Sequence, residues 1–179
     1  DRGQVVLAKD LVLESLVSSS DVGWLEVAIV GDDVENLSAL CAAIVGGPFY
    51  GIARSLGEAL GRLRQLPRLG PILDGENIDV AAQAILGALN AIAFRREPDD
   101  ASAVEEILLP PLRRFKADAL IATVAAALAA LGNTTGATRL VAELSQKFES
   151  LDSQDRASLQ AALAPALVLI IGVVLFPAI

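Results

Sequence analysis

Three groups of ionisable residues could support chemistry: Asp32-Asp33, Asp99-Asp100, and Arg113-Arg114 with Lys116. Paired carboxylates could bind a metal ion or act as acid and base, and the basic cluster could bind a phosphate. Each acid pair, however, precedes an apolar helical segment, where carboxylates cap the helix and complement its dipole. The basic cluster is typical of a solvated helix face. We therefore predict helix caps and a solvated surface at these positions.

The chain has no histidine and a single cysteine, Cys41. It therefore lacks the usual general base near neutral pH, the common metal ligands and any Cys–His or Ser–His nucleophile. No Gly-rich phosphate-binding motif occurs, and we expect the glycines to lie at helix ends as breaks and C-caps. Cys41 lies in an apolar run and is expected to be buried. The sequence predicts no enzyme, no metal site and no cofactor.

The composition is unusually apolar for a chain of this size. Apolar residues make up 54% of the 179 residues and aromatic residues only 4%, with a mean hydropathy of +0.55. This is more apolar surface than a compact soluble domain needs for its core. A membrane-embedded chain, a self-associating chain, or a shell around an apolar cavity would use the excess. The net charge of -8 disfavours nucleic acid and anionic membrane surfaces as partners.

Apolar residues recur at three- and four-residue steps, which predicts an all-α fold of about 10–12 short helices. The helices are expected over residues 4–18, 21–30, 34–45, 48–66, 79–94, 103–109 and 132–151, in a long Ala-rich segment that ends at residue 131, and on both sides of Pro165. Pro110-Pro111 and Pro165 are each expected to end a helix. Short breaks predict antiparallel neighbours, and the hydrophilic segment 95–100 is expected to link two halves.

Residues 132–151 echo residues 47–66 at an offset of 85 residues. The matched pairs are Gly47 with Gly132, Gly51 with Gly136, Arg54 with Arg139, Glu58 with Glu143, Arg62 with Lys147 and Leu66 with Leu151. This echo predicts a single domain, residues 1–179, built from two pseudo-repeats over about 1–97 and 98–179. The charged residues of the first segment are expected to face water. A duplicated chain favours a container or scaffold.

Two windows without charged residues, 119–138 and 157–179, are long enough to cross a bilayer. The Gly132–Gly136 turn interrupts the first window. Pro165, Gly172 and Pro177 interrupt the second, and no basic cluster flanks it. We therefore expect no stable membrane span, and we predict that residues 166–176 form an apolar helix buried at the centre of the fold.

The order and spacing of several motifs resemble the insect allergen-related repeat family, which includes the cockroach group 1 allergen and gut microvillar proteins. The resemblance is carried by Asp10-Leu11-Val12-Leu13, Asp32-Asp33, Gly47-Pro48-Phe49, Asn77-Ile78-Asp79-Val80 and the segment 84–92. It implies two repeats of about 90 residues forming a helical shell around a large cavity that carries fatty acids or phospholipids. It also implies a secreted digestive-tract protein, and some relatives divert plant-defence chemistry.

Composition and resemblance together predict a secreted protein that binds lipids or other hydrophobic ligands without strong selectivity. Residues expected to line the cavity are Phe49, Ile52, Leu56, Leu60, Ile85, Leu89, Leu144, Phe148, Val168 and Ile171. The same faces could form a dry core. The alternatives are a self-assembling protein, including a homo-oligomer, and a membrane-associated helical protein. The start at Asp1 without methionine and the glycosylation sequons at Asn36 and Asn133 favour secretion.

Overall fold

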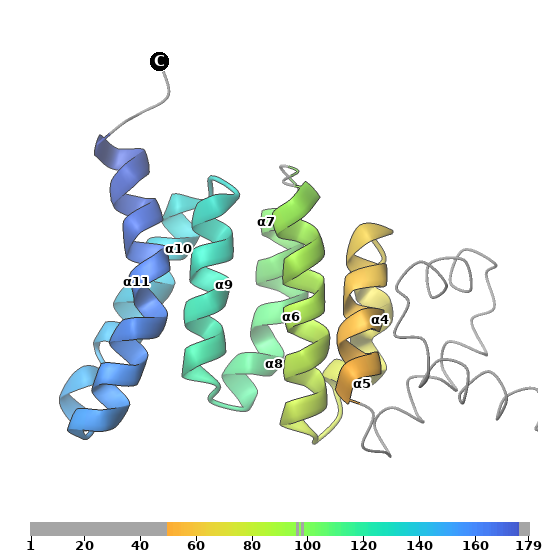
Figure 1. Ribbon diagram of the computed structural model, residues 1–179, viewed down its shortest axis with the longest axis horizontal. Helices are drawn as coiled ribbons and strands as arrows, with labels where there is room; N and C mark the ends of the chain where they lie inside the picture. The colour runs from red at the N-terminus through yellow and green to blue at the C-terminus, as the bar shows by residue number, and fades with distance from the viewer. Residues whose placement is uncertain (1–49, 96, 98, 176–179) are drawn as a thin grey trace, which may run out of the picture. The chain divides into compact units, whose positions relative to one another are not determined.

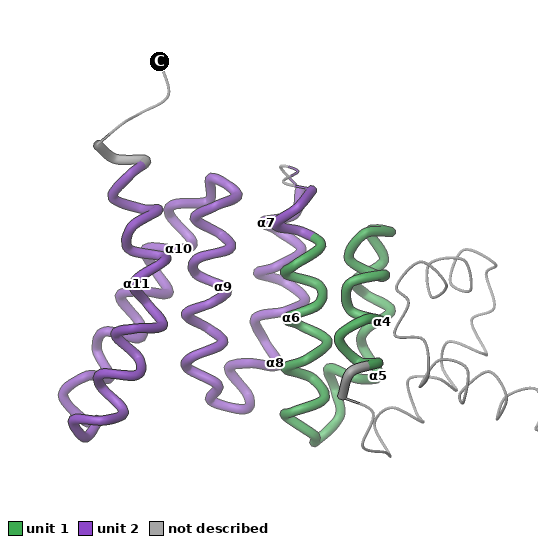
Figure 2. Tube along the Cα trace, viewed as in Figure 1, with its two compact units in different colours: residues 1–91 green, residues 92–179 purple. Residues whose placement is uncertain are grey.

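The computed structural model describes residues 50–95, 97 and 99–175 of the chain. All regular structure in these ranges is helical, which confirms the predicted all-α fold (Figure 1). The chain divides into two compact units, residues 1–91 and 92–179 (Figure 2). The helices predicted before residue 49, the acid pair Asp32-Asp33, Cys41, Asn36 and Phe49 all lie outside the described residues.

The described part of the first unit contains four helical elements: α4 (Tyr50–Arg62), the 3-10 helix η1 (Leu66–Leu69), α5 (Gly70–Leu73) and most of α6 (Ile78–Arg95). Asn77 caps α6, because its side-chain Oδ1 accepts hydrogen bonds from the backbone N–H groups of Asp79 and Val80 at 3.1 and 3.3 Å. The predicted helices 48–66 and 79–94 therefore exist, with boundaries a few residues away from those expected.

The second unit begins in α6 and continues through α7 (Asp100–Ala103), a π-helical segment η2 (Val104–Leu108) and α8 (Leu109–Arg114). The prediction that Pro110-Pro111 ends a helix is wrong. Leu109 donates its N–H to the carbonyl of Val104, one residue farther back than in an α-helix. The prolines then lie in the first turn of α8, where their missing N–H groups interrupt no regular hydrogen bond.

Three helices form a bundle in the second unit: α9 (Asp118–Ala130), α10 (Thr134–Ser145) and α11 (Ser153–Leu175), with a 3-10 helix η3 (Phe148–Ser150) before the last. Between α9 and α10 the chain reverses at Gly132, whose φ of +83° suits a residue without a side chain. The N–H of Asn133 reaches back to the carbonyl of Leu128 at 2.9 Å, which closes the end of α9. This short turn gives the antiparallel α9–α10 pair that short breaks predicted (Figure 1).

The last helix, α11, contradicts one predicted break. Asp152 caps its first turn by accepting hydrogen bonds from the N–H groups of Gln154 and Asp155 at 2.9 and 2.8 Å. Pro165 lies inside α11 and does not end it. Pro165 and Ala161 are both exposed, so water can bind the carbonyl that the proline leaves without its helical N–H.

The two echoed segments both fold as helices, α4 and α10. The division between the two units falls within α6, a few residues before the repeat boundary expected at residue 97. The duplication itself stays a prediction.

Candidate functional site

The acid pair Asp99-Asp100 is part of a structural turn. Asp100 is only 4% exposed, and its Oδ2 accepts hydrogen bonds from the N–H of Glu97 at 3.0 Å and from Arg95 Nε at 3.3 Å. The guanidinium of Arg95 also contacts the other carboxylate oxygen. Asp99 occupies the N-cap position of α7 without a side-chain capping bond, so the predicted cap is not formed. Instead, Asp100 and Arg95 hold the end of α6 against the start of α7.

The basic cluster is solvated, as predicted, because Arg113, Arg114 and Lys116 are all exposed. The guanidinium of Arg114 lies 4.6 Å from the centroid of the Phe115 ring, within the range of a cation–π contact. Arg113 donates a hydrogen bond to Glu143 of α10 at 2.6 Å. These contacts account for two of the three basic groups without a bound anion.

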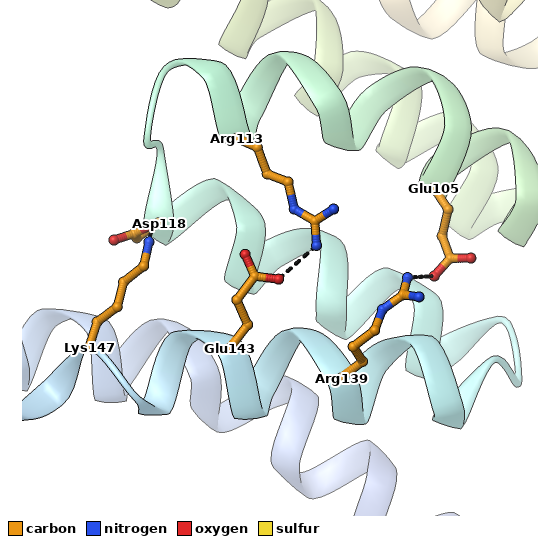
Figure 3. A network of polar contacts seen from close by, with 6 residues as sticks. All are labelled: Glu105, Arg113, Asp118, Arg139, Glu143 and Lys147. Carbon is orange, nitrogen blue, oxygen red and sulfur yellow. Dashed lines mark hydrogen bonds and ion pairs between the residues drawn. The ribbon is translucent and has the colours of Figure 1, made fainter.

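Three ion pairs connect α10 and the turn after it to the segment 104–118, as Figure 3 shows: Arg139 with Glu105 at 2.8 Å, Glu143 with Arg113 at 2.6 Å, and Lys147 with Asp118 at 2.5 Å. The spacing of four residues places Arg139 and Glu143 on one face of α10, and Lys147 follows in the turn after the helix. Each pair is partly exposed and contributes at most about 1 kcal/mol. This charged face orients α10 against its neighbours.

The corresponding charged residues of α4 behave differently. Arg54 and Arg62 are exposed, which confirms the prediction that they face water, while Glu58 is half-buried. Arg62 Nη2 lies 2.5 Å from Glu58 Oε1, so the pair stays within α4.

The predicted lining residues of α4 and α6 lie in a tightly packed interface. Ile52, Leu56, Leu60, Ile85 and Leu89 are all buried. The two helices touch at their backbones: a methyl group placed on Gly57 would lie 1.9 Å from the carbonyl oxygen of Ala84, and one on Gly87 would lie 1.9 Å from that of Arg54. Two helices in backbone contact leave no room for an acyl chain where they cross. A cavity elsewhere in the fold stays a prediction.

The same contact corrects the prediction that the glycines lie at helix ends. Gly57 and Gly87 are inside α4 and α6, and only a residue without a side chain fits at the crossing. Gly61 adds a third close contact, because a methyl group there would lie 2.8 Å from Cβ of Ala91. The signal was present in the sequence as small residues four apart in α4, Ala53, Gly57 and Gly61.

The remaining lining residues fall into two environments. Leu144 in α10 is fully buried, and Phe148 in η3 is half-buried. By contrast, Val168 and Ile171 in α11 are 69% and 52% exposed. The prediction that residues 166–176 form a buried central helix is therefore wrong for the side chains described there, of which only Ala166 is fully buried.

The exposure of α11 follows from its length. At 23 residues it is ten residues longer than α9 and projects past the α9–α10 turn (Figure 1). Its buried side chains, Leu159, Leu163 and Ala166, form one stripe, which continues with half-buried Ile170. Beyond Ala166 lie four large apolar side chains with substantial exposure, here called the apolar tip: Leu167, Val168, Leu169 and Ile171.

The two ends of the α9–α11 bundle differ in charge. The α8–α9 and α10–α11 connections lie at the same end of the bundle (Figure 1). Together they carry Arg113, Arg114, Lys116, Asp118, Lys147, Glu149, Asp152, Asp155 and Arg156. The other end consists of the α9–α10 turn and the second half of α11, residues 131–133 and 164–175, which include no ionisable side chain. The helices α9 and α11, which contain much of the two charge-free windows, pack against each other, and this end of the bundle is uncharged.

Asn133 lies in the turn at this uncharged end and caps α10. Its side-chain Oδ1 accepts a hydrogen bond from the N–H of Gly136 at 2.9 Å. The second predicted sequon therefore lies in an ordered cap.

No family model, no curated protein and no solved structure matches this chain. The resemblance to the insect allergen-related repeat family stays a prediction from residue spacing. Among the described residues, no group of three or more acidic, cysteine or histidine side chains is arranged to bind a metal. Two helices, α6 and α11, are long and apolar enough to cross a membrane by length and composition alone. The apolar tip of α11 is the strongest candidate site in this part of the chain.

Proposed function

We propose that the protein is a non-enzymatic, lipid-binding helical protein that inserts the apolar tip of α11 into one leaflet of a bilayer. The observation that carries this proposal is the apolar tip itself, exposed beyond the end of α9. The nine residues of α11 that follow Ala166, the last fully buried side chain described there, rise about 14 Å, which is about half the thickness of the hydrocarbon core of a bilayer. The length of helix that projects therefore suits a single leaflet.

The tip has enough apolar surface to drive this binding. Its four side chains are each roughly half exposed, so burying the remainder contributes about 1 kcal/mol per side chain. Together they would favour the lipid phase by about 4 kcal/mol, or roughly a thousandfold. Because the exposed tip residues spread over roughly half of the circumference of α11, a lipid phase covers more of them than a single flat protein partner does.

The net charge of -8 provides no attraction to anionic headgroups, so uncharged phosphatidylcholine vesicles are the appropriate probe. We expect the wild-type chain to float with these vesicles in a density gradient. Val168→Asp places a charge in the leaflet and should lower the partition coefficient at least tenfold, because a carboxylate costs about 3 kcal/mol at the bilayer centre. Since Val168 is 69% exposed, folding should be unaffected, as circular dichroism would check.

The matched control is Gln160→Asp, which adds the same charge to an exposed position eight residues earlier in α11. This variant should partition within about twofold of the wild type, since position 160 stays in water. Equal losses in both variants would indicate a nonspecific charge effect and would contradict insertion of the tip. Light scattering without lipid tests the self-assembly alternative: an oligomer that Val168→Asp dissociates would replace the lipid proposal with pairing between chains.

A further inference from the structure

Phe94 is the most exposed large apolar side chain among the described residues, at 95%. It lies in the last turn of α6, within the second unit, and follows a run of buried residues that includes Ile92 at 0% exposure. Its backbone is held in place, because the next residue, Arg95, pairs with the buried Asp100. At this exposure, the Phe94 side chain contributes little to the packing of the described residues.

The position of this residue connects it with α11. The last turn of α6 and the projecting part of α11 lie at the same end of the second unit, opposite the charged connections (Figure 1). The α9–α10 turn, which has no ionisable residue, lies at that end as well. We infer that Phe94 is a second insertion point, so that this end of the unit lies on the bilayer at two places. This inference rests on the proposed function of α11.

The charges around Phe94 indicate how deeply it would insert. The charge of Arg95 is balanced by Asp100, whereas Glu97 is half-exposed and Asp99 is exposed. Carboxylates in these positions stay at the headgroup level, so the phenyl ring would reach only the outermost part of the hydrocarbon. An aromatic ring at this depth sets the orientation of a helix end at a membrane surface. The negative charges of Glu97 and Asp99 also make an uncharged lipid surface the suitable partner.

Tryptophan fluorescence tests this contact directly. The chain has one tryptophan, Trp24, which Trp24→Phe removes as a background signal. In that background Phe94→Trp reports on the inferred contact, and Phe115→Trp is the matched control at the charged end of the same unit. With phosphatidylcholine vesicles we expect the Phe94→Trp emission to shift to the blue and to be quenched by lipids brominated near the headgroup. The Phe115→Trp emission should change in neither respect.

Phe94→Ala should also weaken partitioning of the full chain about tenfold, because a large aromatic side chain no longer enters the lipid. Ile78→Ala, at the opposite end of α6, should leave partitioning unchanged. Vesicle binding by the Phe94→Trp chain with no shift or lipid quenching of its emission would overturn the second contact and leave the α11 proposal intact. Failure of the wild-type chain to bind vesicles would overturn both proposals.

Discussion

The helices α6 and α11 have the same mean hydropathy over 18 residues, yet half of that window is buried in α6 and only 17% in α11. Small residues account for the burial of α6. Gly87, Ala84, Ala88 and Ala91 let α4 approach its backbone, so its larger side chains are enclosed on several sides. In α11 Ala166 is the last fully buried side chain described, and the large apolar side chains after it are exposed or half-buried. Hydropathy alone thus describes how apolar a helix is, whereas the spacing of small residues and the length of its neighbours decide what covers it.

Replacement of one glycine in each helix should give the largest difference in unfolding free energy between α6 and α11. Gly87→Ala would place Cβ 1.9 Å from the carbonyl oxygen of Arg54, so α4 and α6 must separate. We expect a loss of at least about 4 kcal/mol in unfolding free energy, more than ordinary overpacking costs, because the backbone itself has to move. Gly172→Ala in α11 meets nothing within 4 Å and should instead gain about 0.5–1 kcal/mol. Urea denaturation measures both, and a small effect for Gly87→Ala would contradict the backbone contact.

Truncation of one isoleucine in each helix should give a smaller difference in stability between α6 and α11. Ile85 in α6 is fully buried, so Ile85→Ala should cost about 3 kcal/mol through lost burial and a residual cavity. Ile171 in α11 is 52% exposed, and Ile171→Ala should change stability by no more than about 0.5 kcal/mol. The comparison requires thermal unfolding without lipid. Similar losses at both positions would mean that α11 is covered in solution and would argue against a free apolar tip.

Replacement of a proline should have the smallest effect on stability, and it tests whether α11 is continuous through residue 165. Pro165→Ala restores the hydrogen bond to the carbonyl of Ala161, and we expect a gain of about 2 kcal/mol after the lost rigidity of the unfolded chain is subtracted. Pro67→Ala, in the first turn of η1, should show no gain because the N–H there has no helical partner. If Pro165→Ala also left stability unchanged, the proline would lie at a break in α11 and the helix would be shorter than described.

Sequence reasoning predicted the helices well and their surroundings less well. The three-to-four-residue apolar period located α4, α6, α9 and α10 because it reports a face that must be buried. It could not show that Pro110-Pro111 and Pro165 would be accommodated, since a π turn and an exposed carbonyl depend on backbone geometry and local solvent. It also placed Val168 and Ile171 in the interior, because an apolar run has the same composition whether or not a neighbour covers it. The spacing of Ala53, Gly57 and Gly61 indicates a close helix contact, although the glycines were expected only at helix ends.

The cap at Asn133 has a consequence for where the molecule can act. Its Oδ1 holds the first turn of α10, while a sugar would be attached to the other side-chain atom, Nδ2, so capping and glycosylation use different atoms of one residue. A branched oligosaccharide at that turn would stand in front of the uncharged end and keep it in water. Modified and unmodified molecules would then form two populations, one confined to the aqueous phase and one able to adsorb to lipid. If the chain enters a secretory pathway, glycosylation of this one asparagine would determine which population a given molecule joins.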